Sequence, residues 1–217
     1  MKKRLHDKKA GIAILISLII ISLAEVIFRA VAIGEAVLTT SNLGEQLAVI
    51  ALAAIILILT AKGKDRACYI CYGAWIGYFV LDQIFELPGS VIELVNFMSS
   101  GVPSLGGIIR VAISIFIIAL GVLLVEYMSD GTIFNKLFNA LSLIAVLLVL
   151  VSFGLSISAL ASDMSGFAPD MFTAEELKIN VALDAFNNAY RFVMIFMFTF
   201  FAYDSAKMQL KKTDLTK

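Results

Sequence analysis

Apolar residues fill six long stretches of this chain, and short polar segments separate them. Each stretch is near or above the ~20 residues that an α-helix needs to cross a hydrocarbon layer of ~30 Å. The second stretch is the shortest. The spans predicted from this pattern are residues 10–33, 46–61, 68–87, 104–126, 134–160 and 180–204.

Two of the segments between spans carry structural signals of their own. Residues 88–103 are weakly apolar and bounded by Pro88 and Pro103, which predicts a short helix lying in the outer membrane interface. Thr173 precedes Glu176 by three residues, the spacing of a capping box. The sixth helix is therefore predicted to begin near Ala174.

The composition supports a protein embedded in a lipid bilayer. Of the 217 residues, 60% are hydrophobic, and the mean hydropathy is +0.95. A soluble domain has about 45–50% apolar residues, and a soluble fold of this size could not hide the excess. We predict an all-α integral membrane protein, a single bundle of six transmembrane helices formed by residues 1–217, with no room for a second domain of ordinary size.

Basic residues set the expected orientation. Thirteen of the 17 lysines and arginines lie in the two terminal segments, in residues 62–66 and at position 136, which the predicted spans place on one side of the membrane. Lys178 alone lies on the other side, and the remaining three arginines lie within spans. Since lysine and arginine favour the cytoplasmic side, both termini are predicted to be cytoplasmic in a multi-pass protein of the cell membrane. An alternative stays open for the first span, because a basic start, an apolar run and the small residues of 30–32 are also features of a cleaved signal peptide.

Seven ionisable residues fall within the predicted spans, all in the outer half. They are Glu25, Arg29, Asp82, Glu86, Arg110, Asp184 and Arg191. A charge near the bilayer centre costs ~2.5–3.5 kcal/mol, so seven unpaired charges would cost on the order of 20 kcal/mol, comparable to the stability of a whole domain. We therefore expect these side chains to face one another or water.

Spacings of three and four residues place these charges on four polar stripes, one on each of four helices. The stripes are Ser22, Glu25 and Arg29; Trp75, Phe79, Asp82 and Glu86; Gly107, Arg110 and Ser114; and Asp184, Asn187 or Asn188, and Arg191. One interpretation is an outward-open polar pocket between the first, third, fourth and sixth helices. The other is a buried ion-pair network that fixes helix packing and binds nothing.

Arg191 is the deepest of the seven charges and keeps its proton in proteins. It lies about eleven residues, or ~16 Å, from the outer end of its span. Glu25 is the acid at the closest predicted depth. We therefore expect Arg191 and Glu25 to face each other, the first and sixth helices to be neighbours, and Asn187 or Asn188 to line the same cavity.

Small residues and cysteines have simpler interpretations. Gly73 with Gly77, and Gly154 with Ser158, have the four-residue spacing that allows close helix approach in membranes. Cys68 and Cys71 form C-x-x-C, a spacing that also occurs in redox and zinc sites. With no second pair and no nearby histidine, we interpret them as small apolar side chains.

The sequence lacks the residue patterns that most kinds of enzyme chemistry require. The single histidine is His6, in the basic tail, whereas a metal-dependent intramembrane enzyme needs histidine ligands in its spans. Glu25 and Arg29 match part of the first motif of CAAX-type intramembrane proteases, but Ala24 stands where that motif has glutamate. No nucleotide, dinucleotide or serine-hydrolase motif occurs, so we expect no cofactor, no metal and no enzyme activity, although carboxylate chemistry stays open. No basic domain indicates a nucleic acid partner.

The pattern favours a small-solute transporter or the substrate-binding subunit of one. In architecture alone, six helices with both ends inside and an outer site are similar to the substrate-binding subunits of energy-coupling-factor vitamin transporters. The mixed charges favour a zwitterionic or polar solute, and active transport would need an ATPase subunit, another membrane partner or an ion gradient. The alternative is a membrane scaffold, immunity or regulatory subunit of a larger complex.

The predicted orientation can be tested by cysteine labelling of intact cells. A membrane-impermeant thiol reagent should fail to label Lys64→Cys and Thr213→Cys, because both positions are predicted to be cytoplasmic. The same reagent should label Asp170→Cys. External labelling at position 64 would contradict the six-span arrangement.

Overall fold

The computed structural model describes residues 4–32, 41–99, 105–130, 135–161 and 174–214. These residues form helices and no strand, which confirms the all-α prediction for this part of the chain. The helices are α1 (Arg4–Ala32), α2 (Ser41–Ala61), α3 (Asp65–Ser99), α4 (Leu105–Asp130), α5 (Asn135–Ala161) and α6 (Ala174–Asp214). The sixth helix begins at Ala174 as predicted, whereas its proposed cap, Thr173, lies outside the described residues.

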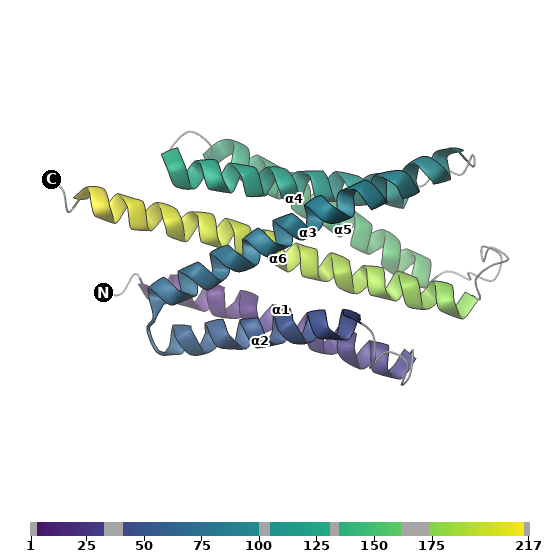
Figure 1. The fold of residues 1–217 in the computed structure, drawn as a ribbon, viewed down its shortest axis with the longest axis horizontal. Helices are drawn as coiled ribbons and strands as arrows, with labels where there is room; N and C mark the ends of the chain where they lie inside the picture. The colour runs from purple at the N-terminus through teal and green to yellow at the C-terminus, as the bar shows by residue number, and fades with distance from the viewer. Residues whose placement is uncertain (1–3, 33–40, 100–104, 131–134, 162–173, 215–217) are drawn as a thin grey trace.

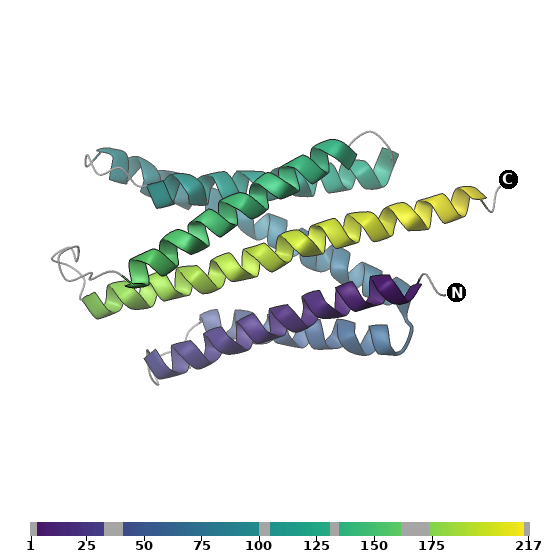
Figure 2. The ribbon, with the colours of Figure 1, turned by 180° about the vertical axis from the view of Figure 1, so that it is seen from behind.

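Successive helices run in opposite directions and form a bundle with two outer hairpins. Figure 1 shows α1 with α2 on one side, α4 with α5 on the other, and α3 and α6 crossing between them. The view from behind shows α6 running between the α1 and α5 helices (Figure 2). Helix α6 contacts α1, α3, α4 and α5, whereas α2 contacts α1 and α3. The prediction that the first and sixth helices are neighbours is therefore confirmed.

Four of the described helices are long and apolar enough to cross a membrane. The qualifying segments are Lys9–Ala32, Leu43–Ala61, Leu105–Val125 and Lys136–Leu160. They belong to α1, α2, α4 and α5, the helices of the two outer hairpins. Helices α3 and α6 each carry a polar stripe. The stripe of α3 includes Asp82, Gln83 and Glu86, and the stripe of α6 runs from Asp184 to Arg191. The two crossing helices thus carry many of the polar residues, whereas Glu25 and Arg29 lie on α1 and Arg110 lies on α4.

The surface of the bundle suits lipid better than water. Large apolar side chains lie open on it, among them Val31 at 83% exposure and Phe85 at 79%. The interior is built from aliphatic and aromatic side chains of all six described helices, among them Leu15, Ile117 and Phe198, each fully buried. On α1 the buried positions 11, 15, 18, 22 and 25 recur every three or four residues, so one face of α1 points inward along most of its length.

Helix α3 is longer than predicted, and the separate interface helix expected at 88–103 is not formed over the described residues. Helix α3 continues through Pro88 to Ser99. Proline removes one backbone hydrogen bond from a helix, but membrane helices tolerate this loss when neighbouring groups compensate, so Pro88 does not end the helix here. At 35 residues, or ~52 Å, α3 crosses the bundle obliquely (Figure 1).

The predicted close approaches of small residues are wrong, and a different glycine makes one. A Cβ added at Gly77 or Gly154 would meet nothing within 4 Å, and one at Gly73 would make only ordinary contact with Phe201. A Cβ at Gly121 of α4 would lie 2.6 Å from Cγ2 of Val80 on α3. Gly121 therefore sets how closely α4 approaches α3 beside the polar residues of both helices.

Gly121→Ala should destabilise the protein. The valine side chain is stiff, and overpacking of this kind costs about 1–3 kcal/mol, more than the ~1 kcal/mol that alanine gains over glycine in a helix. Thermal unfolding in detergent measures the change. Gly154→Ala is the matched control and should lose nothing, and Val80→Ala should restore the stability of Gly121→Ala. Equal stability of the two alanine variants would contradict the close approach.

Candidate functional site

Polar side chains reach the described interior from five helices, and those of α3, α4 and α6 contact one another. The buried polar residues are Ser22, Glu25, Gln83, Ser114, Ser142, Asn188 and Arg191. Gln83 follows Phe79 by four residues on the inward face of α3, and Arg191 follows Asn188 by three on the inward face of α6. Each helix therefore presents its polar positions to the interior as part of the same stripe that carries its apolar ones.

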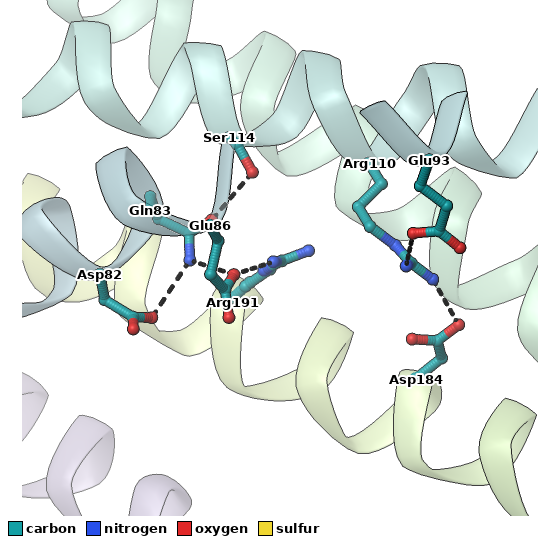
Figure 3. Close-up of polar contacts among 8 residues, drawn as sticks. All are labelled: Asp82, Gln83, Glu86, Glu93, Arg110, Ser114, Asp184 and Arg191. Atoms are coloured by element: carbon teal, nitrogen blue, oxygen red, sulfur yellow. Dashed lines mark hydrogen bonds and ion pairs between the residues drawn. The ribbon is translucent and has the colours of Figure 1, made fainter. Parts of the chain in front are cut away.

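Gln83 is the centre of the polar contacts (Figure 3). Its amide oxygen accepts a hydrogen bond from Oγ of Ser114 on α4, at 3.1 Å. Its amide nitrogen donates to Oε2 of Glu86, at 3.2 Å, and has a longer contact of 3.4 Å with Oδ2 of Asp82. Nη2 of Arg191 on α6 donates to the same Oε2 of Glu86, at 3.3 Å. We call Asp82, Gln83, Glu86, Ser114 and Arg191 the central cluster.

The ion pair of the central cluster is unevenly buried. The side chain of Arg191 is 4% exposed, whereas that of Glu86 is 48% exposed. A guanidinium carries five N–H donors, yet Arg191 makes one side-chain hydrogen bond within the described residues, and its buried Nε has no partner there. Because an unsatisfied buried donor costs about 1–3 kcal/mol, and more when charged, Arg191 is an expensive residue to keep in this conformation.

A second group of charges joins the same three helices nearer the end of the bundle where α6 begins. Arg110 of α4 contacts Asp184 of α6 at 2.8 Å and Glu93 of α3 at 3.6 Å. We call these residues the outer trio (Figure 3). All three side chains are 39–56% exposed, and ion pairs exposed to this degree contribute about 0–1 kcal/mol in water. No buried side-chain atom of the trio lacks a hydrogen-bond partner, whereas Nε of Arg191 has none within the described residues.

The third group is an ion pair contained within α1. Nε and Nη2 of Arg29 both donate to Oε1 of Glu25, at 2.9 and 2.6 Å, and both side chains are largely buried. The predicted pairing of Arg191 with Glu25 is therefore wrong. A partner one turn away is the easier one to reach, and the continuation of α3 past Pro88 invalidates the shallow depth assigned to Glu86.

The nine candidate residues predicted from the sequence thus separate into groups. Asp82, Glu86 and Arg191 meet in the central cluster, Arg110 and Asp184 in the outer trio, and Glu25 and Arg29 in the α1 pair. Of the two asparagines, Asn188 is buried and Asn187 is exposed. Arg191 is nevertheless close enough to interact electrostatically with Arg110, Asp184 and Asp82, so the central cluster and the outer trio adjoin.

Several polar residues near these charges were absent from the predicted set, among them Gln83 and Glu45. Gln83 was missed because the predicted stripes were built around charged residues, although its spacing of four from Phe79 marks it as inward-facing. Glu45 lies near the start of α2 and one residue before the predicted second span. It is exposed, but its carboxylate interacts electrostatically with those of Asp82, Glu86 and Glu25. Acidic side chains from α1, α2 and α3 thus lie near one another.

Aromatic side chains fix the register between α3 and α6 beside the cluster. The indole N–H of Trp75 donates to the hydroxyl of Tyr190, at 3.1 Å. The ring of Phe79 packs edge-on against the same tyrosine, with centroids 5.7 Å apart. Tyr190 directly precedes Arg191, and Phe79 lies one turn before Gln83, so this packing holds Arg191 opposite Glu86.

The two cysteines lie far along α3 from the cluster. The thiol of Cys68 is 3.5 Å from Oγ1 of Thr60 and 3.8 Å from the carbonyl oxygen of Ile56, and neither Cys68 nor Cys71 forms a disulfide. Within the described residues, no three His, Cys, Asp or Glu side chains are grouped to hold a metal ion. The contacts of Cys68 are those of a small buried side chain.

The α1 pair predicts a measurable coupling. Arg29→Met should lower the free energy of unfolding by about 3 kcal/mol, because it leaves the Glu25 carboxylate buried without a counter-charge. Adding Glu25→Gln to the same chain should restore most of the loss. Thermal unfolding in detergent of the two single variants and the double variant gives the coupling energy. Additive effects would show that the two residues act independently.

Comparisons with known proteins give no relative for this chain. No family model matches it, no curated protein matches it and no solved structure matches it. The function must therefore be argued from the polar interior and from the helices that hold it.

Proposed function

We propose that this chain is a six-span protein of the cell membrane that binds a small polar solute, as a transporter or as the substrate-binding subunit of one. Helices α3 and α6, with 35 and 41 residues, exceed the ~20 needed to cross a bilayer. They lie between four helices that are apolar enough to span it. In the proposed arrangement all six helices cross, and the flanking four shield the polar stripes of α3 and α6 from lipid.

The orientation in the proposal has support from the fold. Both termini, the end of α2 with the start of α3, and the end of α4 with the start of α5 lie at one end of the bundle (Figure 1). The sequence places nearly all lysines and arginines outside the spans at these same positions. That end is cytoplasmic in the proposal, so the outer trio faces the exterior and the central cluster lies below it.

The observation that carries the proposal is the incomplete bonding of Arg191. A residue retained only to fix packing is expected to have its donors satisfied, because a half-satisfied buried charge is worse for stability than an apolar side chain. Arg191 is 4% exposed and has an unpartnered Nε within the described residues. A bound solute would supply the missing acceptors, and intramembrane charges of this kind commonly mark solute pathways.

Solute access in the proposal follows the half-exposed carboxylates. Glu86 touches Arg191 and is itself 48% exposed, so it links the buried guanidinium to the surface of the bundle. The outer trio lies between the cluster and the proposed exterior. Energy for active transport would come from an ion gradient or from an ATPase or other membrane partner.

A second candidate function is a membrane scaffold, immunity or regulatory subunit. The outer trio and the α1 pair favour it, because their charges are satisfied by one another. Ion pairs of this type can define helix packing without binding anything. The two candidates differ in what they require of Arg191.

Arg191→Met separates the two candidates. If Arg191 is kept for a solute, removing its charge should leave the free energy of unfolding nearly unchanged, because its buried Nε has no partner within the described residues to lose and its ion-pair partner Glu86, at 48% exposure, is not left as a buried unpaired charge. Thermal unfolding in detergent measures the change, with Arg29→Met, from the satisfied α1 pair, as the matched control that should lose stability. A loss at Arg191→Met as large as that of the control would favour the scaffold.

A further inference from the structure

Nε of Arg191, which has no hydrogen-bond partner within the described residues, indicates one end of the solute. Its single side-chain bond within the described residues, to Glu86, uses Nη2, and Nε is buried without a partner. Figure 3 shows the remainder of the guanidinium extending away from Glu86, toward Arg110 and Asp184. The group that completes Arg191 must be an acceptor, and a carboxylate matches the planar fork of a guanidinium with two parallel hydrogen bonds.

The acidic residues beside Arg191 define the other end. Glu86 uses only Oε2 in its contacts with Gln83 and Arg191, and Asp82 uses only Oδ2 in its contact with Gln83. The second carboxylate oxygen of each has no hydrogen bond within the described residues. Carboxylate oxygens are acceptors only, so these two call for a donor, and a cationic amine is the donor that also matches their charge.

The spacing of these groups sets the size of the charge separation in the solute. Nη2 of Arg191 and Oε2 of Glu86 are 3.3 Å apart. A solute that meets both residues must therefore carry its negative and positive groups side by side. An α-amino acid has its carboxylate and ammonium on one carbon and meets this condition, whereas a zwitterion with a long chain between its charges does not.

The surrounding charges disfavour a solute of a single sign. Arg191 lies within electrostatic range of Glu86, Asp184 and Asp82, and also of Arg110. A simple anion on Arg191 would be repelled by three carboxylates, and a simple cation would leave the donors of Arg191 unmet and be repelled by two arginines. A neutral zwitterion adds no net charge to a region poor in water, where unbalanced charge is most costly.

We infer that the solute is a zwitterion of α-amino-acid type, with its carboxylate on Arg191 and its ammonium on Glu86 and Asp82. This inference rests on the proposed function, since it names the solute of the same site. Glu86 then has two roles. It pairs with Arg191 when no solute is bound, and it binds the ammonium group when the carboxylate of the solute displaces Glu86 from part of the guanidinium. Gln83 holds Glu86 within reach of both positions.

The inference can be tested by binding to the purified full-length protein in detergent. The probes are L-alanine, its carboxylate half propionate, its amine half ethylamine, and ε-aminocaproate, whose charges are far apart. Binding is followed by calorimetry and by thermal shift. L-alanine should bind about tenfold or more tightly than each of the other three, since each charge-assisted contact is worth at least a factor of ten.

Variants assign the two ends of the solute. Glu86→Gln should weaken L-alanine about tenfold and strengthen propionate, because it removes the ammonium partner and frees Arg191 from its internal competitor. Arg191→Met should abolish binding of both. Asn187→Ala is the control. Asn187 is exposed, unlike its buried neighbour Asn188, so this variant should change the affinity for neither L-alanine nor propionate.

The inference is overturned if L-alanine binds no more tightly than propionate or ethylamine, or if ε-aminocaproate binds with the same affinity as L-alanine. It is likewise overturned if L-alanine does not bind at all. It is also overturned if Glu86→Gln changes L-alanine and propionate in the same direction. These outcomes are separate from the failure of the proposed function. If Arg191→Met is stable but the unsubstituted protein shows no preference for L-alanine, a solute site of another class remains. If Arg191→Met is destabilised, the proposed function fails as well.

Discussion

The way in which the polar stripes of α3 and α6 face each other depends on the cost of keeping the Arg191 charge away from water. A guanidinium does not lose its proton in proteins, so a partner must come to it, and here the partner is Glu86 of α3. That requirement draws α3 and α6 together with their polar stripes facing inward. The four more apolar helices then lie outside, and their exposed aliphatic side chains suit a medium that makes no hydrogen bonds.

Hydrophobic attraction alone could not select this arrangement in a bilayer, because lipid tails are as apolar as the helices. Shape and hydrogen bonds select it instead. The Trp75–Tyr190 hydrogen bond and the Phe79–Tyr190 contact set the register of α3 against α6. Gly121 lets α4 come close to Val80, which brings Ser114 within hydrogen-bonding distance of Gln83. The position of the polar cluster is thus a product of packing on both sides of it.

Much of the fold could be predicted from composition and periodicity, and much of the pairing could not. Six apolar stretches gave six helices, and the three-to-four-residue spacing placed Glu25, Arg110 and Arg191 on polar stripes correctly. The predicted Arg191–Glu25 pair was wrong because the depth of each charge in the membrane was counted along straight helices that end at proline. Helix α3 instead passes through Pro88 and crosses the bundle obliquely. Gln83 was overlooked because a neutral amide gives no charge signal, and Gly121 because the meaning of a single glycine depends on the neighbour it faces.

Pro88 gives α3 two mechanical parts. Proline has no N–H, so the carbonyl of Ile84 loses its usual helical donor, and bending at that point breaks one hydrogen bond fewer than elsewhere. Before it, α3 is packed into the bundle as far as Gln83; beyond it, the side chains are mostly exposed and Glu93 reaches Arg110. A bend of α3 at Pro88 would therefore be confined to a single turn, and it would leave the carboxamide of Gln83, which orients Glu86, in place.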